Sequence, residues 1–353
     1  MAHPLKGRGA LSNPDGRFCR LNSETVDDGW YPEEPPSSIA TSVEPDHARS
    51  VISTNDSPDI PFDQSINPYR GCEHGCVYCY ARPSHAYLGL SSGLDFETRL
   101  FYKADAARRL TEELARPGYV CKPIVLGANT DPYQPIERRL EVTRSILQVL
   151  RQCRHPVSIV TKGALILRDA ELLAEMARDG LASVAVSVTT LDAELKRRLE
   201  PRAAAPQARL GVVRRLAAAG VPVGVLVAPV IPAITDHELE SIIEAAAAAG
   251  ARSAGYVLLR LPHDLGTLFR EWLAEHYPQR EQHVMSLIAA LRGGRDNDPR
   301  FGARMRGTGP FAELLRMRFQ LACARNGLRS GRSLPLVTTL FRRPDSGQLE
   351  LGI

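Results

Sequence analysis

The sequence has no apolar run that approaches the roughly 18 residues needed to span a membrane. Its first residues, MAHPLKGRGALSNPDGRF, also lack the apolar core of a secretory signal. Its seven cysteines are an odd number in which one close trio stands apart from four single residues, and this pattern is not a disulfide framework. We therefore expect a protein of the reducing cytoplasm without a membrane segment.

Neither sign of charge dominates the chain, since 44 lysines and arginines face 40 aspartates and glutamates, for a net charge of +4. This balance permits an anionic substrate without requiring one. Residues 292–343 depart from it and form a candidate surface for nucleic-acid phosphates, with a solvated helical face as the alternative. The arginines there are Arg292, Arg295, Arg300, Arg304, Arg306, Arg316, Arg318, Arg325, Arg329, Arg332, Arg342 and Arg343, against Asp296, Asp298 and Glu313.

Composition divides the chain into three parts. Residues 1–60 are rich in proline, serine, aspartate and glycine and show no sustained period, which predicts an irregular N-terminal arm. Residues 61–265 alternate short β-branched runs with amphipathic helical stretches. Residues 266–353 predict a helical, arginine-rich C-terminal extension that ends in the strand-like PLVTTLF and a short tail.

The alternation within residues 61–265 predicts parallel βα units in an α/β fold. Five strand candidates follow one another, and a sixth around QSINPY precedes the cysteine trio. Six parallel strands predict an incomplete (β/α)6 barrel, with its chemistry at the carboxyl ends of the strands. The five candidates are PIVLGA at 123–128, PVSIVT at 156–161, SVAVSV at 183–188, PVGVLVAPVI at 222–231 and AGYVLL at 254–259.

Cys72, Cys76 and Cys79 follow a predicted strand directly and stand among loop-forming, polar neighbours. Three thiolates this close together can all point inward only around a shared metal centre. Zinc is one possibility, with His74 as a fourth ligand, although the sequence shows no second cysteine pair of the usual zinc type. A four-iron cluster is the other, because three thiolates leave one of its irons open to a chelating cosubstrate.

Polar residues also follow the first of the five runs, at the end where such a barrel keeps its site. Asn129, Thr130 and Asp131 lie there, in a turn stiffened by prolines. They are candidates for contacting a cofactor. The alternative for Asp131 is the N-cap of a helix that begins after it.

The next two runs end in further polar residues. Lys162 follows the second run, where its ammonium group can meet an anion such as a carboxylate. Ser187 and Thr189 end the third run, where a hydroxyl can hold a ribose. These three residues complete the set of candidate cofactor contacts at the strand ends.

The segment CEHGCVYC resembles the cluster motif of the radical SAM superfamily, including the aromatic residue before the third cysteine, here Tyr78. The resemblance implies that Cys72, Cys76 and Cys79 bind a [4Fe-4S] cluster whose fourth iron is chelated by S-adenosylmethionine. Reductive cleavage would then give methionine and a 5′-deoxyadenosyl radical that abstracts hydrogen from a substrate. The resemblance also implies that Tyr78 lies against the adenine, and that an electron donor such as flavodoxin or ferredoxin is needed.

Lys162 and Ser187 resemble positions of the spore photoproduct lyase subgroup, in which a lysine and a serine after successive strands contact the cosubstrate. The likeness spans residues 61–262. That subgroup repairs a thymine dimer in DNA with a cysteine near the end of its second strand. Here Cys121 and Cys153 precede their strands instead, so we do not expect dimer reversal by the same route.

We therefore predict a radical SAM enzyme that acts on a large substrate, with nucleic acid, as a DNA lesion or an RNA, preferred over a protein or peptide. The alternative class is a non-catalytic module that holds zinc or a structural cluster on the same thiols. Tyr80, Tyr87 and Tyr133 are candidates for relaying hydrogen in place of the absent strand-end cysteine. The cysteines outside the trio, at positions 19, 121, 153 and 323, are expected to be packing residues.

Overall fold

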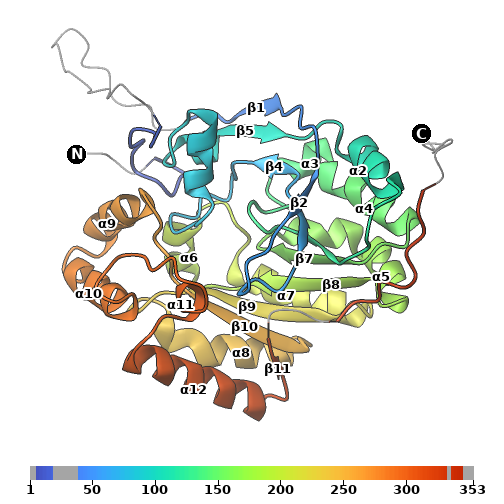
Figure 1. Cartoon of the computed structure of the whole chain (residues 1–353). Coiled ribbons are helices and arrows are strands. Elements are labelled where there is room, and N and C mark those ends of the chain that lie inside the picture. Colours follow the sequence, from blue (N-terminus) through green and yellow to red (C-terminus); the bar gives the residue numbers. More distant parts are fainter. Residues whose placement is uncertain (1–4, 19–38, 332–334, 345–353) are drawn as a thin grey trace, which may run out of the picture.

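A computed structural model describes residues 5–18, 39–331 and 335–344. Its main sheet holds eight strands in the order β11-β10-β9-β8-β7-β6-β3-β2 and is not closed (Figure 1). Seven of these strands run parallel and lie side by side in the order of the chain, and six of the seven form the body of the sheet. They are β3 (Gln64–Ile66), β6 (Ile124–Leu126), β7 (Val157–Thr161), β8 (Ala182–Ser187), β9 (Val223–Val230) and β10 (Ser253–Leu258).

Two short strands extend this set, one at each edge. β2 (Ile52–Thr54) pairs antiparallel with β3, and β11 (Arg329–Ser330) pairs parallel with β10. The six strands expected from the sequence are thus neighbours in an open α/β sheet, but that sheet is wider than the expected six strands.

A second, three-stranded sheet joins the N-terminal arm to the rest of the fold. β1 (Ser42–Pro45) pairs parallel with β5 (Arg99–Tyr102), which pairs antiparallel with β4 (Tyr69–Arg70). Because β1 and β2 both lie within residues 1–60, the expectation of an irregular arm is wrong at these two places. Both strands are short and mostly exposed, and a neighbouring strand rather than their own pattern stabilises them.

Helices follow the parallel strands and pack on the outer side of the sheet (Figure 1). The longer ones are α2 (Ala106–Ala115), α4 (Val142–Gln152), α5 (Ala170–Arg178), α7 (Pro206–Ala218) and α8 (Leu239–Ala248). The short ones are η1 (Arg82–Leu88), α1 (Asp95–Thr98), α3 (Glu137–Leu140), η2 (Ala164–Asp169), α6 (Ala193–Leu199) and η3 (Asp236–Glu238).

The C-terminal extension is helical, as expected. It contains α9 (Leu265–His276), α10 (Glu281–Leu291), α11 (Ala303–Arg306) and α12 (Pro310–Arg325). None of the described helices combines the length and the apolar character that crossing a bilayer requires.

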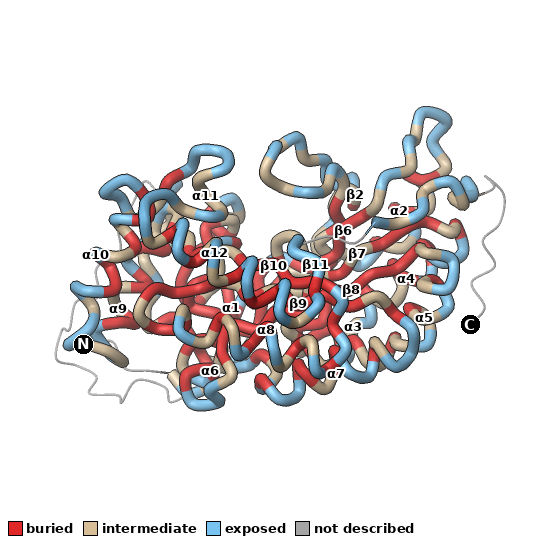
Figure 2. The backbone as a smooth tube through the Cα atoms, turned by 90° about the horizontal axis from the view of Figure 1, so that it is seen from below, coloured by how far each residue is buried: buried red, intermediate tan, exposed pale blue. Residues whose placement is uncertain are grey.

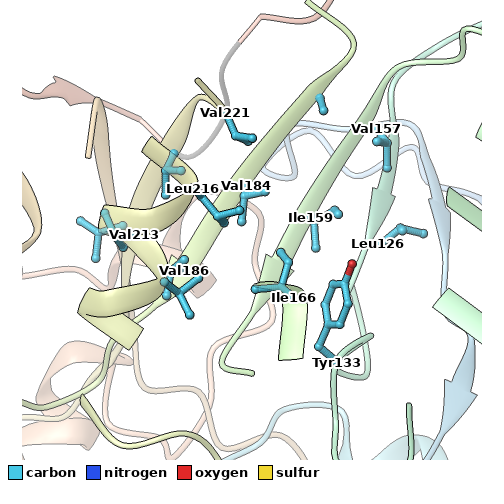
Figure 3. Packing of buried hydrophobic residues seen from close by; sticks show 14 of the residues in the cluster. Leu126, Tyr133, Val157, Ile159, Ile166, Val184, Val186, Val213, Leu216 and Val221 are labelled. Atoms are coloured by element: carbon cyan, nitrogen blue, oxygen red, sulfur yellow. The ribbon is translucent and has the colours of Figure 1, made fainter. Parts of the chain in front are cut away.

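The main core lies between the sheet and its outer helices. Val157 and Ile159 of β7, with Val184 and Val186 of β8, are buried in one cluster with Leu216 of α7 (Figure 3). Alternate residues of a strand point to opposite faces, so these β-branched side chains all leave the sheet on the helix side. Figure 2 shows the strands as buried segments, with exposed segments in the loops and on the outer helices. The core thereby fixes the strand ends that carry the polar candidates.

Residues 335–344 contain no strand, although PLVTTLF was expected to form one. The Val337 amide donates to the Gly180 carbonyl at 3.0 Å, and the Arg342 amide donates to the Cys153 carbonyl at 2.8 Å. These acceptors precede β8 and β7, so the segment runs across the amino-terminal side of the sheet. Its apolar pattern serves packing rather than a strand ladder.

Candidate active site

The inner side of the open sheet encloses a cavity of about 680 Å³. Strand residues that alternate with the core residues line it, among them Ser158, Ala185 and Ala228. Because these side chains are small, they leave the interior of the sheet unfilled. The cysteine loop, residues 72–79, lines the same cavity together with the polar strand ends.

Cys72, Cys76 and Cys79 all line this cavity, and none of them forms a disulfide. Burial raises the pKa of Cys72 well above its ordinary value, and the charges of Asp131 and the other two thiols add to the rise. Burial likewise raises the pKa of Cys76 to about 12. A bound cationic metal centre would offset this effect and keep the thiols deprotonated.

The donor set fits an iron-sulfur cluster. Three soft sulfur donors lie on the wall of a largely apolar cavity, and iron-sulfur clusters use thiolates in this way. Within residues 5–18, 39–331 and 335–344, no three cysteine, histidine or carboxylate side chains converge as ligands of a single metal ion do.

Two buried side chains hold the cysteine loop from its outer side. The Arg82 guanidinium donates to the Cys76 carbonyl at 2.8 Å and forms an ion pair with Glu97. The Glu97 carboxylate also accepts the amides of Gly9 and Ala10, at 3.0 and 2.9 Å. The N-terminal segment is therefore part of the wall behind the cysteines. Neither Arg82 nor Glu97 stood out in the sequence, because a single arginine and a single glutamate form no recognisable pattern.

Gln134, in the turn after β6, also holds the loop. Its Oε1 accepts the Glu73 amide at 2.9 Å, and its Nε2 donates to the Gly71 carbonyl at 3.2 Å. The side chain is fully buried, so both bonds are shielded from water. Its only sign in the sequence is a polar residue within a proline-stiffened turn.

Asp131 joins the ends of β6 and β7 to the cysteine loop. Its carboxylate accepts the Thr161 hydroxyl and the Lys162 amide, both at 2.7 Å, and lies 3.3 Å from Nδ1 of His74. Burial raises the pKa of Asp131, but His74 and these hydrogen bonds outweigh burial and hold it at about 2. The next helix begins only at Glu137, so the alternative of a helix N-cap is wrong.

Lys162 places its ammonium group beside the cavity. Its Nζ donates to the Ser187 hydroxyl at 3.0 Å and lies 5.8 Å from the centroid of the Tyr78 ring. Lys162, Ser187 and Tyr78 all line the cavity that the cysteines line. The arrangement supplies a positive charge, a hydroxyl and an aromatic face within one wall.

A buried polar cluster supports Tyr78 from behind. The Tyr78 hydroxyl donates to Glu200 and lies 3.0 Å from Oγ1 of Thr189. Glu200 also accepts the Thr189 hydroxyl at 2.8 Å and forms an ion pair with Arg209. Burial raises the pKa of Glu200, but Arg209 and the hydrogen bonds outweigh burial and hold it at about 2. Thr189 thus contacts the back of the site and is not part of the described cavity lining.

The two remaining candidates differ in position. Asn129 lines the cavity, and its backbone amide donates to the side-chain oxygen of Asn67 at 2.9 Å. Thr130 is buried, and its hydroxyl donates to the Tyr69 carbonyl at 2.7 Å. Thr130 therefore ties the turn to β4 and is absent from the described cavity lining.

Of the three tyrosines considered for hydrogen relay, Tyr80 lines the cavity. The Tyr133 hydroxyl donates to Asp169 at 3.1 Å in the core, and Tyr87 is 72% exposed. The structure therefore leaves Tyr80 as the one of these three in the cavity wall.

Three further cysteines belong to the described residues, and none of the three is part of this wall. Cys153 and Cys323 are buried in the main core cluster, which agrees with a packing role. Cys121 is partly exposed just before β6. Burial raises the pKa of each of these thiols to about 11. Cys19 lies outside the described residues.

Many arginines of residues 292–343 have partners within the protein. Arg292 is buried and donates to the carbonyls of Leu258 and Leu259. The ion pairs are Arg300–Asp298, Arg304–Asp59, Arg316–Glu313 and Arg318–Glu240. The exposed arginines without such a pair among the described residues are Arg295, Arg306, Arg325, Arg329, Arg342 and Arg343, of which Arg343 donates to the Pro117 carbonyl. Arg332 lies outside the described residues. The basic surface is thus smaller than the sequence suggested.

Comparison with protein families gives one match, in which the model of the radical SAM superfamily covers residues 66–246, just over half of the chain. An uncharacterised protein of Mycobacterium tuberculosis is 41% identical over 222 residues, which is 62% of this chain and 65% of that protein. The chain thus spans just under two thirds of the length of that relative. An uncharacterised protein of Methanocaldococcus jannaschii is 26% identical over 173 residues, 49% of this chain and 62% of that protein.

Solved structures show a similar fold. A spore photoproduct lyase complexed with a dinucleoside spore photoproduct superposes with a TM-score of 0.57 at 15% identity, over 82% of this chain and 81% of that one. A mutant of that lyase with bound AdoMet and the same lesion gives a TM-score of 0.57 over 82% and 80%. At this identity the likeness is one of fold.

Proposed function

Because this chain belongs to the radical SAM superfamily and is therefore an enzyme, we propose that Cys72, Cys76 and Cys79 hold a [4Fe-4S] cluster, with S-adenosylmethionine beside it. The family implies both groups. The observation that carries the assignment is that the three thiols share one cavity with Lys162 and Ser187. When bound, the cluster supplies the electron that splits the cosubstrate into methionine and a 5′-deoxyadenosyl radical, which abstracts hydrogen from the substrate.

The alternative of a non-catalytic metal-binding module is not retained, because the family is one of enzymes. We propose that residues 61–265 form the catalytic part, with residues 1–60 as the arm and residues 266–353 as the extension.

In this proposal the strand-end residues bind and orient the cosubstrate. Lys162 faces the carboxylate, because an ammonium group in an apolar cavity gains most from an anionic partner. Ser187 lies next to Lys162 and offers a hydroxyl to the same molecule. The Tyr78 ring forms a flat wall for the adenine, and Asn129 offers an amide group at the end of β6.

Asp131 lines the cavity and also positions a neighbouring residue, whereas Glu200 acts from behind the cavity wall. Asp131 fixes the backbone of Lys162 through its amide, and Glu200 fixes the hydroxyl of Tyr78. Both carboxylates are ionised at neutral pH, so neither is a candidate proton donor there. Thr130 and Thr189 support the same strand ends from behind.

Anaerobic reconstitution with iron and sulfide tests this assignment. We expect a brown protein with thiolate-to-iron absorption at about 400 nm. Dithionite with S-adenosylmethionine should then release 5′-deoxyadenosine. A colourless protein that releases none after reconstitution would refute the proposal.

For the substrate we propose a nucleic acid, as a DNA lesion or an RNA, rather than a protein or peptide. Met305 of α11 lines the cavity, and the next residue, Arg306, is exposed and has no ion pair among the described residues. Phe62 and Tyr80 add aromatic side chains to the lining, which suit a base taken out of its stack. The similarly folded lyase is complexed with a dinucleoside lesion.

Dimer reversal with a strand-end cysteine is not part of the proposal. Within the described residues, the cavity lining contains no cysteine besides Cys72, Cys76 and Cys79. If hydrogen is relayed through the protein, Tyr80 is the candidate, since it alone of the tyrosines considered lines the cavity.

Salt-dependent binding of DNA and RNA tests the substrate class. Arg306→Glu should make the slope of log K against log salt shallower by about one unit, because one phosphate contact is lost. The matched control is Arg178→Glu, an exposed arginine at the end of α5, which should leave the slope unchanged. Equal slopes for wild type and Arg306→Glu would favour a protein or peptide substrate instead.

A further inference from the structure

The outer side of the cysteine loop is covered by the end of α6 and the turn after it. The Val77 amide donates to the Leu199 carbonyl at 3.1 Å, and the Arg202 amide donates to the His74 carbonyl at 3.2 Å. Main chain therefore contacts main chain here, and the side chains of Leu195 and Leu199 pack in one buried cluster with Val77 and Tyr78. A protein that docks on the outer surface of α6 is therefore one helix away from the cysteine loop.

The N-terminal segment also packs directly against the cysteine loop. A Cβ atom on Gly9 would lie 1.8 Å from the Gly75 carbonyl oxygen, so the two backbones approach more closely than any side chain allows. Arg8, next to Gly9, donates to the Thr41 hydroxyl at 2.9 Å; Thr41 donates to Glu73 at 3.1 Å, and Glu73 pairs with Arg202. Arg8 and Arg202 are thus joined through the Glu73 carboxylate behind the loop.

The exposed side of this cover is basic. We call Arg197, Arg198 and Arg202 the basic α6 face. Arg197 is exposed and forms no ion pair within the described part of the chain, and the other two side chains are 36% and 38% exposed. Glu194 pairs with Arg198, and Glu73 pairs with Arg202, so the face is only partly neutralised.

The helix dipole does not account for the whole face. It favours cations in the last turn of α6, where Arg197 and Arg198 lie. Arg202 follows the helix and is 38% exposed, so it adds positive charge to the face independently of the dipole, whereas Arg8 is buried. Positive charge from α6 and from the turn after it thus gathers over the metal-ligand loop.

We propose that the basic α6 face is the docking surface for an acidic one-electron donor protein of the flavodoxin class. The inference rests on the proposed function, since only a cluster on the neighbouring thiols gives the electron a destination. One electron leaves the donor, and it is used when the sulfonium C–S bond of S-adenosylmethionine breaks to give neutral methionine and the 5′-deoxyadenosyl radical. Complementary charge brings the donor to a surface whose helix contacts the cysteine loop directly.

The other basic surface of the protein is less suited to this partner. That surface belongs to residues 292–343, and its exposed arginines Arg325 and Arg329 lie at the end of α12 and in β11. Helix α12 packs against α8, on the side of the main sheet away from β4 and β5 (Figure 1). A donor bound there would face the outer helices rather than the cysteine loop.

The test compares two reductants on the reconstituted enzyme. Formation of 5′-deoxyadenosine is measured with dithionite, and with increasing amounts of a purified, reduced bacterial flavodoxin at low salt. For Arg197→Glu/Arg198→Glu we expect about a tenfold higher KM for flavodoxin and an unchanged rate with dithionite. Neutral Arg197→Gln/Arg198→Gln should give a smaller rise in KM, and it provides the comparison if charge reversal impairs folding.

The matched control is Arg325→Glu/Arg329→Glu, which changes the net charge by the same amount. We expect its KM for flavodoxin to equal that of the wild type. An unchanged KM in both α6 variants, or an equal rise in the control, would overturn the docking surface. If dithionite yields no 5′-deoxyadenosine with the wild type, the proposed function itself fails, and the two failures are thereby told apart.

Discussion

The buried ion pair of Glu200 with Arg209 offers the sharpest test of how the site is supported. Both side chains are almost completely shielded from water, and Glu200 also accepts hydrogen bonds from Tyr78 and Thr189. Glu200→Gln keeps the shape of the side chain but removes its charge. The variant leaves the Arg209 guanidinium buried without a counter-charge.

The size of the effect follows from the pKa of Glu200. Lowering this pKa from 4.5 to about 2 corresponds to a preference of about 3 kcal/mol for the charged carboxylate in the folded protein. Removal of one partner from a buried ion pair costs about 3–5 kcal/mol. We therefore expect Glu200→Gln to lower the free energy of unfolding by about 3 kcal/mol at neutral pH.

Urea unfolding of the cluster-free protein measures this loss, and the apparent KM for S-adenosylmethionine reports whether Tyr78 has moved. Because folding lowers the pKa of Glu200, the stability that its charge contributes to the wild type is fully present above pH 4.5 and decreases as the pH falls toward 2. The difference in free energy of unfolding between the wild type and Glu200→Gln should decrease over the same pH range.

The matched control is Glu194→Gln, which removes the charge of a 61% exposed glutamate paired with Arg198 on α6. We expect it to cost less than about 0.5 kcal/mol, since exposed pairs of this kind contribute little. A loss of less than about 1 kcal/mol in Glu200→Gln, or equal losses in both variants, would refute the reasoning from burial.

Three further outcomes are expected. Burial lowers the pKa of His155 to about 4, so as the pH falls below 6.5 only the unfolded chain takes up a proton at this residue. The free energy of unfolding of the wild type should therefore fall by about 2 kcal/mol between about pH 7.5 and about pH 5. Urea titrations of His155→Gln should not show this loss. Gly75→Ala should lower the free energy of unfolding by about 1–2 kcal/mol, because φ at this position is +67° and the new Cβ would lie 2.7 Å from a Glu97 oxygen. The variant should also bind less iron per chain, and a full iron content would contradict this reasoning. Cys79→Ala should abolish the absorption at about 400 nm, whereas Cys153→Ala, a core thiol, should retain it, and equal spectra would count against the assigned ligands.

The strands of the main sheet were predictable because each carries its own local signal. Short β-branched runs bounded by turn residues identify β6 to β10 to within one or two residues at each end. β1 and β2 carry no such signal. They form because β5 and β3 offer hydrogen-bond partners, and such partners from distant parts of the chain are invisible in a local pattern. PLVTTLF is the converse case, a local strand pattern without a partner strand.

The candidate site divides in the same way. The cysteine spacing is a local pattern, and the carboxyl ends of parallel strands meet at one edge, so Asp131, Lys162 and Ser187 could be expected near the cysteines. Gln134 and Arg209 could not, because each is a single polar residue whose role depends on a partner far away in the chain. Hydrogen bonds of this kind leave no periodicity in the sequence.

These supporting contacts extend the site beyond the segment that matches the superfamily. The match begins at residue 66, yet the amides of Gly9 and Ala10 bind the Glu97 carboxylate that pairs with Arg82. Arg82 in turn holds the Cys76 carbonyl. A buried carboxylate that lost these amides would carry unpaired acceptors behind the metal-ligand loop, which is costly. The geometry of the loop is therefore a property of the N-terminal segment as well as of the cysteine motif.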